Sequence, residues 1–112
     1  MAISAQWDEV MKRLDYLEQY DVLHPTLEAQ RGVVAALRGD PGFADVQPGL
    51  SHATLTLRIR DRKRGVMVSW DDERKRFDVA FLDPGLEIVE CRGVPPPEVV
   101  ATVIEYLDRI RS

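Results

Sequence analysis

Basic residues gather in one short stretch of the chain, and their charge and spacing suit binding more than catalysis. Arg58 and Arg60 alternate with apolar residues on a predicted strand, and Arg62, Lys63 and Arg64 fill the turn that follows. These five residues, called the basic hairpin below, could bind phosphate or an acidic protein surface. The alternative is that they only keep an edge strand in solution and in register. No aromatic residue alternates with them to stack on bases, which favours protein over nucleic acid.

Three other residues could be drawn as a hydrolytic triad. His52, Ser69 and Asp78 all lie at strand positions that face away from the expected core. A flat strand surface supplies neither a pocket nor a pair of amide donors for an oxyanion, so we expect no catalytic role. Cys91 lies beside Arg92, which would lower the pKa of its thiol, but no base or second cysteine accompanies it. We interpret Cys91 as a half-buried structural thiol.

Metal and cofactor motifs are missing from the sequence. The run Asp71-Asp72-Glu73 lacks the alternating ligands and central glycine of a calcium loop, and it ends in basic residues. One cysteine and two histidines are a poor supply of zinc ligands, and no glycine-rich phosphate loop occurs. We therefore predict a non-enzymatic protein with no metal and no cofactor.

Apolar spacing predicts two helices before the basic hairpin and one after it. Ser4 can cap a first helix whose apolar residues recur every three or four positions. A second helix is expected from Pro25 to Gly39, with Gly39 in a left-handed C-terminal position. The strongest helical pattern runs from Val99 to Ile110, after three prolines.

Between these helices the apolar period becomes two, which predicts four antiparallel strands joined by short turns. The expected registers place Ile59 opposite Val68 and Trp70 opposite Phe77, and a type II turn at Pro84-Gly85 places Phe81 opposite Ile88. We predict that Trp70 packs in the core, against the C-terminal helix near Val103 or Leu107. The order α-α-β-β-β-β-α indicates a single α+β domain, residues 1–112, built as a two-layer sandwich.

The outer face of the predicted sheet carries apolar residues where water would favour polar ones. Two interpretations remain open. In the first, a helix covers this face or its apolar residues are scattered and harmless. In the second, the face docks a partner or a second copy of the chain. Its central residues, which we predict to bind a partner, are Met67, Ala80, Leu82 and Val89.

The net charge and the lack of long apolar runs argue against nucleic-acid binding and against a membrane-spanning protein. The 112 residues carry a net charge of −4, yet residues 51–82 hold 8 basic and 5 acidic residues. An acidic chain with a local basic island disfavours general nucleic-acid binding. No apolar run approaches the ~20 residues of a membrane-spanning helix, and the first residues lack a signal-peptide pattern. We therefore expect a cytoplasmic protein that binds no membrane.

The second half of the chain resembles the small immunity proteins of bacterial toxin systems. The segments that carry this resemblance are Gly65–Trp70, Phe77–Phe81 and Glu98–Leu107. It implies a cytoplasmic, non-catalytic bacterial protein that binds and blocks one toxin domain. We predict a protein-binding module, of the immunity or chaperone-like kind or a homodimer. The alternative is a small enzyme or ligand-binding domain with a cleft near His24 or the basic hairpin.

Overall fold

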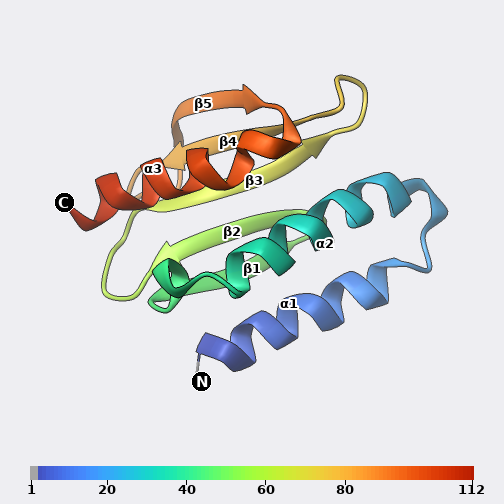
Figure 1. Ribbon diagram of the computed structural model, residues 1–112, viewed down its shortest axis with the longest axis horizontal. Helices are drawn as coiled ribbons and strands as arrows, with labels where there is room; N and C mark the ends of the chain where they lie inside the picture. Colours follow the sequence, from blue (N-terminus) through green and yellow to red (C-terminus); the bar gives the residue numbers. More distant parts are fainter. Residues whose placement is uncertain (1–2) are drawn as a thin grey trace.

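Three helices pack on an antiparallel sheet in the computed structural model, which describes residues 3–112 (Figure 1). The helices are α1 (Ile3–Leu17), α2 (His24–Arg38) and α3 (Val99–Arg111). The strands are β1 (Val46–Ser51), β2 (Thr54–Ile59), β3 (Gly65–Asp71), β4 (Arg76–Leu82) and β5 (Ile88–Val94). Short 3-10 turns occupy 21–23, 41–43 and 96–98. The predicted α+β class and the order of helices and strands are confirmed, with one strand more than expected.

The strand that the sequence did not reveal is β1, which lies at one edge of the sheet in the order β1-β2-β3-β4-β5. It contains Pro48 and Gly49, two residues that weaken a strand and that look like loop residues in the sequence. Proline is tolerated on an edge strand because the amide hydrogen it lacks would have no partner on the open side. Pairing of Val46 with Ile59 and of Leu50 with Leu55 fixes β1 against β2.

The helix ends differ in detail from those predicted. Helix α1 already includes Ile3, so Ser4 lies inside its first turn and is not its cap. Helix α2 ends at Gly39 with φ −85°, a right-handed conformation, and the predicted left-handed end is wrong. Helix α2 begins at His24, and a single 3-10 turn over residues 21–23 leads into it from the end of α1.

Only one of the predicted strand registers is confirmed in full. Trp70 lies opposite Phe77, as expected. Val68 pairs with Leu55 and not with Ile59, because β2 ends at Ile59 and the loop to β3 is longer than a tight turn. The β4–β5 pair has a register irregularity at Leu82, which places Ile88 opposite Leu82 instead of Phe81. The turn before it carries its positive φ, 64°, at Leu86 and not at Gly85, so it is not type II.

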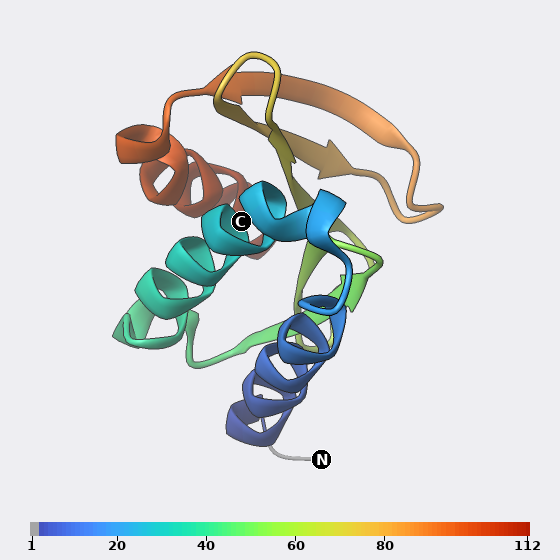
Figure 2. The same ribbon diagram turned by 90° about the vertical axis from the view of Figure 1, so that its right-hand side faces the viewer.

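The core lies between one face of the sheet and all three helices, which makes a two-layer sandwich. Seen along the molecule, the strands arch around the helices (Figure 2). The inward residues of β2, β3 and β4 meet the apolar stripes of the helices in one buried cluster. Its tryptophan is Trp7, which is 3% exposed. Trp70 is half-buried at the margin, stacked edge-on against Phe77 at 4.8 Å, so its predicted central position is wrong.

Candidate protein-binding surface

The basic hairpin joins β2 to β3 and is exposed along its whole length. Arg58 belongs to β2, and Arg60, Arg62, Lys63 and Arg64 lie in the connection that ends at Gly65. Asp61 turns the chain with φ 66°, a left-handed conformation that aspartate tolerates better than most residues. The sequence therefore predicted correctly that these cations are exposed, but Arg60 lies in the connection and not on the strand, and the register of β2 with β3 is not the one predicted.

Unbalanced charge distinguishes this hairpin from the rest of the chain. Nine of the 15 basic residues lie within 4.0 Å of a carboxylate. Within residues 3–112, no ion pair is found for the five residues of the hairpin or for Arg13 on α1. The unpaired cations are thus concentrated on one part of the surface, where they are available to an anionic partner.

Arg64 differs from the other hairpin cations because it contacts an aromatic ring. Its guanidinium lies 5.9 Å from the centre of the Phe81 ring, and Arg109 of α3 lies over the same ring at 5.7 Å. Arg109 also lies 5.2 Å from the ring of Tyr106, so it is held between two aromatic side chains. These cation–π contacts give Arg64 a structural role. Arg58, Arg60, Arg62 and Lys63 are the freer binding candidates.

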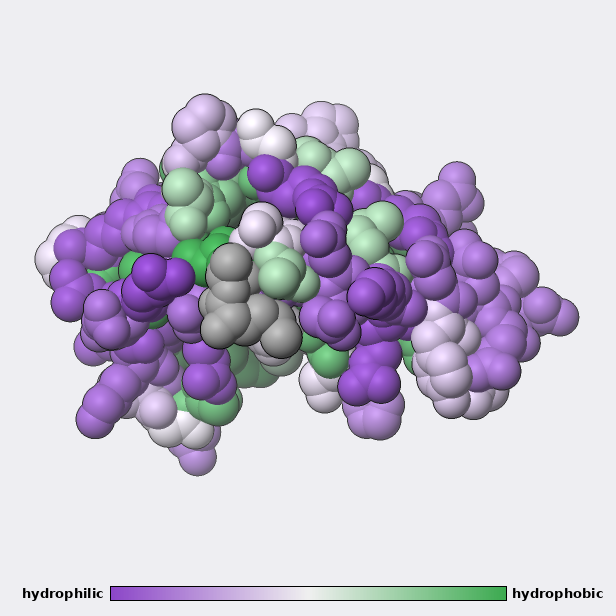
Figure 3. All heavy atoms as spheres, turned by 90° about the horizontal axis from the view of Figure 1, so that it is seen from below, coloured by the Kyte–Doolittle hydropathy of each residue, from purple (hydrophilic) through white to green (hydrophobic). Residues whose placement is uncertain are grey.

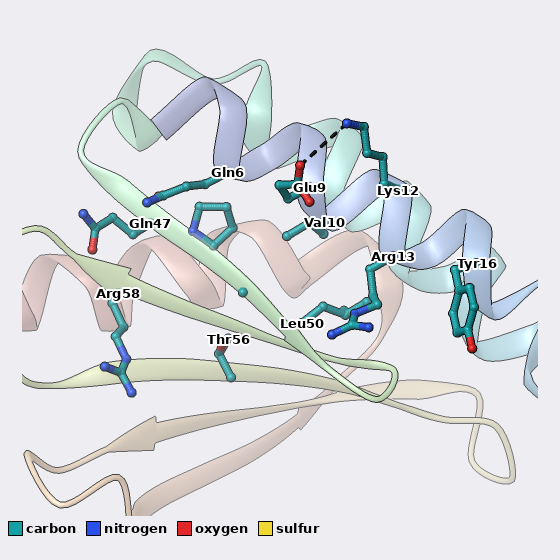
Figure 4. Close-up of a pocket in the computed structure, with 12 residues that line it drawn as sticks. Gln6, Glu9, Val10, Lys12, Arg13, Tyr16, Gln47, Leu50, Thr56 and Arg58 are labelled. Atoms are coloured by element: carbon teal, nitrogen blue, oxygen red, sulfur yellow. Dashed lines mark ion pairs between the residues drawn. The ribbon is translucent and has the colours of Figure 1, made fainter. Parts of the chain in front are cut away.

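A groove of about 840 Å³ separates α1 from the outer side of β1 and β2 (Figure 4). Its wall on α1 includes Arg13, Tyr16 and the ion-paired Glu9 and Lys12, and its strand side includes Gln47, Gly49, Thr56 and Arg58. Figure 4 shows Arg13 and Arg58 toward opposite ends of the set, with Thr56 between them. We call this the cationic groove. It joins one residue of the basic hairpin, Arg58, to the unpaired Arg13.

The floor of the cationic groove is open because β1 carries a glycine there. Gly49 pairs with Thr56, and a Cβ added at Gly49 would lie 2.9 Å from the Thr56 hydroxyl oxygen. A larger residue at position 49 would therefore displace Thr56 or fill the space above it. On the helix side, the side-chain oxygen of Gln6 is buried without a hydrogen-bond partner.

A second, more apolar groove of about 860 Å³ adjoins the first and shares Arg13, Tyr16 and Leu50 with it. It extends over the α1–α2 connection, where Val22 is 86% exposed. Tyr16 and Tyr20 are also exposed, and the nearby Tyr16 hydroxyl raises the pKa of Tyr20. Seen from the α1 side, the surface is mostly hydrophilic with separate apolar areas (Figure 3).

The outer sheet face is less available than the sequence suggested. Ala80 is 2% exposed and Leu82 is 5% exposed within the single chain, and Met67 is half-buried. Ala80 lies between its strand neighbours Met67 and Cys91. None of the helices described for residues 3–112 crosses this region (Figure 2). The side chains of Leu82 and Arg58 both lie close to Gly65 of β3. The methylene groups of Arg58 therefore shield part of this outer face from water.

Exposed apolar residues are found instead around the β4–β5 turn. Val89 is 64% exposed, as predicted for an outer-face residue, and Ile88 is 56% exposed. Leu86, in the turn before β5, is 46% exposed. The bulge at Leu82 and the positive φ of Leu86 rotate this end of β5 away from the core.

The other candidate chemical groups remain dispersed. Ser69 lies opposite Asp78, whereas His52 lies in the β1–β2 turn, and no side-chain hydrogen bond joins two of these residues in the part of the chain described. Asp78 instead faces Arg76 at 3.6 Å. His24 Nε2 donates a hydrogen bond to the Glu18 carbonyl oxygen at 2.8 Å, and His24 lines neither groove.

Two local environments also differ from expectation. Cys91 is exposed, and desolvation of its thiol, followed by the charge of Asp78, raises its pKa. Arg92 does not lower it, because this guanidinium pairs with Glu105 of α3. Asp71 accepts backbone hydrogen bonds from Glu73 and Arg74, and the Arg74 amide is the main cause of its lowered pKa. This acidic run is a capped turn.

Sequence reasoning missed Arg13 and the cationic groove because both depend on β1. Arg13 gave no sequence signal, because Glu9 lies four positions before it on α1 and looks like its ion-pair partner, whereas in the structure Glu9 lies 3.6 Å from Lys12. Its approach to Arg58 depends on the edge strand between them, which the Pro-Gly pair concealed.

Comparison with models of protein families, with curated proteins and with solved structures finds no match to this chain. None of the described helices is long and apolar enough to cross a membrane. Among residues 3–112, no three His, Cys, Asp or Glu side chains gather closely enough to hold a metal ion.

Proposed function

We propose that this chain is a non-catalytic protein-binding module whose partner presents an acidic surface to the basic hairpin. The observation that carries the proposal is the absence of ion pairs at the hairpin, in the part of the chain described, against nine paired cations elsewhere. An acidic chain that neutralises most of its cations but leaves one group of them free favours an external anion.

An immunity protein or a chaperone-like protein fits this proposal, since both act by binding a partner and covering its working surface. A cytoplasmic location and a bacterial source belong to the same proposal. The partner is expected to be a protein rather than a nucleic acid, because the rest of the chain is acidic and would repel a long polyanion.

The proposal is tested by reversing charge at two matched positions. The Arg62→Glu/Lys63→Glu variant changes the hairpin, and the control Arg74→Glu/Lys75→Glu makes the same charge change at the β3–β4 turn, where both cations are ion-paired locally. Affinity-tagged wild type and both variants are used to capture partners from the native host, and any captured protein is purified and titrated against each.

The expected result is an acidic partner that binds wild type and the control and loses roughly tenfold or more in affinity for the hairpin variant. For an immunity protein, adding the chain also abolishes the activity of that partner. Equal binding by wild type and hairpin variant would disprove the role of the hairpin.

A second candidate function is a small-ligand domain that uses the cationic groove, because Arg58 of the hairpin lines a concave site of suitable size. It predicts that small organic anions raise the unfolding temperature of the protein. An Arg58→Gln variant would lose that effect and retain its fold, since the Arg58 side chain is exposed.

A further inference from the structure

We propose that the cationic groove binds an extended, carboxylate-rich segment of the partner protein, with an apolar residue of that segment seated in the adjoining groove. This inference rests on the proposed function and adds a second contact to the basic hairpin. It assigns Arg13, which no sequence motif singled out, to the same binding surface as Arg58.

The cationic groove carries positive charge that residues 3–112 do not themselves neutralise. Arg13 and Arg58 are the two cations of the groove without an ion pair in the described chain, whereas Lys12 is 3.6 Å from Glu9. Guanidinium groups bind carboxylates in planar, two-pronged geometry, and the partial enclosure of a groove strengthens such pairs relative to open water.

The shape of the cationic groove favours an extended ligand over a compact one. The groove runs between a helix and an edge strand, and Arg13 and Arg58 lie toward opposite ends with Thr56 between them (Figure 4). One small anion could contact one end only. An extended chain with several carboxylates contacts both, while the Thr56 hydroxyl and the Gln47 amide offer hydrogen bonds along the floor.

The neighbouring apolar groove can hold an apolar side chain of the same segment. It shares Arg13, Tyr16 and Leu50 with the cationic groove, so a segment leaving one enters the other without a break. Exposed Tyr20 and Val22 form its far wall. Tyrosine and arginine side chains, such as Tyr16, Tyr20 and Arg13 here, are typical anchors of protein interfaces.

The test uses two fluorescent peptides and the full-length protein. One probe is decaglutamate, and the other has three leucines in place of its last three glutamates. Arg13→Gln and Arg58→Gln are the groove variants, and Arg74→Gln is the control with the same charge change at a distant turn. All three side chains are exposed, so each variant is expected to fold.

Anisotropy titrations are expected to show binding of decaglutamate that weakens roughly tenfold in each groove variant and stays unchanged in the control. Binding weakens with added salt, because the Debye length falls to about 3 Å at 1 M. The leucine-bearing probe binds more tightly, and Val22→Ser removes that advantage without changing decaglutamate affinity. Backbone amide shifts on peptide addition are expected at Gly49 and Thr56.

Several outcomes would overturn the inference. Tighter binding of a single-stranded oligonucleotide of equal charge, lost in the same variants, would assign the groove to nucleic acid. Equal displacement by acetate or inorganic phosphate would assign it to small anions. If a captured partner requires Arg62 and Lys63 but not Arg13 or Arg58, the groove inference fails and the proposed function stands. If the groove binds the peptide as expected while hairpin reversal leaves partner binding unchanged, the proposed function fails.

Discussion

Gln30 of α2 donates a hydrogen bond from its side-chain nitrogen to the carbonyl oxygen of Val68 in β3, at 2.8 Å and fully buried. The same nitrogen donates to the Ala53 carbonyl at 3.0 Å, where the chain enters β2. One amide thus ties a helix to two points of the sheet, beside Leu55, the partner of Val68. It is the only fully buried polar residue among the largest buried side chains of residues 3–112.

Replacing Gln30 with Met is expected to destabilise the protein by about 1–2 kcal/mol, because two carbonyl groups lose their donor. Loss of the unpartnered Gln30 oxygen offsets part of this cost. Gln30→Glu should cost more, since it removes the donors and buries a carboxylate. Urea unfolding measures both, with Gln19→Met as the exposed control. A Met variant as stable as wild type would show that the carbonyls find other partners.

The two tryptophans are expected to differ in their contribution to stability. Trp7→Ala should cost about 3–5 kcal/mol, the usual loss for a buried large aromatic residue. Trp70→Ala should cost roughly 1–2 kcal/mol, because this ring is half-buried and its indole nitrogen donates to the exposed Asp72. Denaturant unfolding of both variants checks the order. A larger loss at Trp70 would contradict the register at the end of β3.

The ion pair between Asp45 and Arg111 should make stability depend on pH in the acid range. Arg111 Nη2 donates to Asp45 Oδ1 at 2.7 Å and to the Gly42 carbonyl at 2.6 Å, which joins the end of α3 to the start of β1. The hydrogen bond from Arg111 holds the pKa of Asp45 below its ordinary value of 3.8. The contribution is therefore present above pH 3.8 and lost as the pH falls through the lowered folded-state pKa.

A double-mutant cycle with Asp45→Asn and Arg111→Met measures this pair. The expected coupling is about 0.5–1 kcal/mol at pH 7, reduced because both side chains are partly exposed. It should vanish at low pH, when Asp45 is protonated. The pair Lys12–Glu9, exposed and 3.6 Å apart, is the matched control and should show less coupling. Coupling that persists in acid would mean that a hydrogen bond to the neutral Asp45 side chain, and not the charge, carries the energy.

Self-association, if the chain forms the predicted homodimer, is expected to involve the end of β5 and not the centre of the outer face. Ala80→Glu would place a charge at a position only 2% exposed in the single chain and damage the fold itself. Val89→Glu changes a residue that is 64% exposed on an edge strand. It should leave the unfolding temperature within a few degrees of wild type and weaken any dimer.

Light scattering over a range of concentrations decides this prediction. A dimeric wild type and a monomeric Val89→Glu variant are the expected pair of results. A dimer that survives Val89→Glu would place the contact elsewhere, and a wild type that stays monomeric would leave Leu86, Ile88 and Val89 as exposed apolar residues without an association role.

Local periodicity was sufficient to determine the three helices, four of the five strands and the exposed basic hairpin. Amphipathic spacing at Trp7, Leu14 and Val103 marks residues that any fold of this chain must bury, and alternation at Leu55 and Leu57 does the same for a strand. These patterns involve only a few neighbouring residues, so they can be recognised without knowing which helix or strand each segment packs against.

Tertiary structure decided what depends on pairing between distant segments. Pro48 and Gly49 form a strand because β2 supplies hydrogen bonds on one side, while the other side of β1 is a sheet edge with no neighbouring strand among the described residues to pair with. The long connection after Ile59 shifts the β2–β3 register, and one bulge at Leu82 turns Leu86 and Ile88 outward. Arg13 and Arg58 line one groove only because α1 lies along that edge, and no local pattern encodes the placement of two residues 45 positions apart.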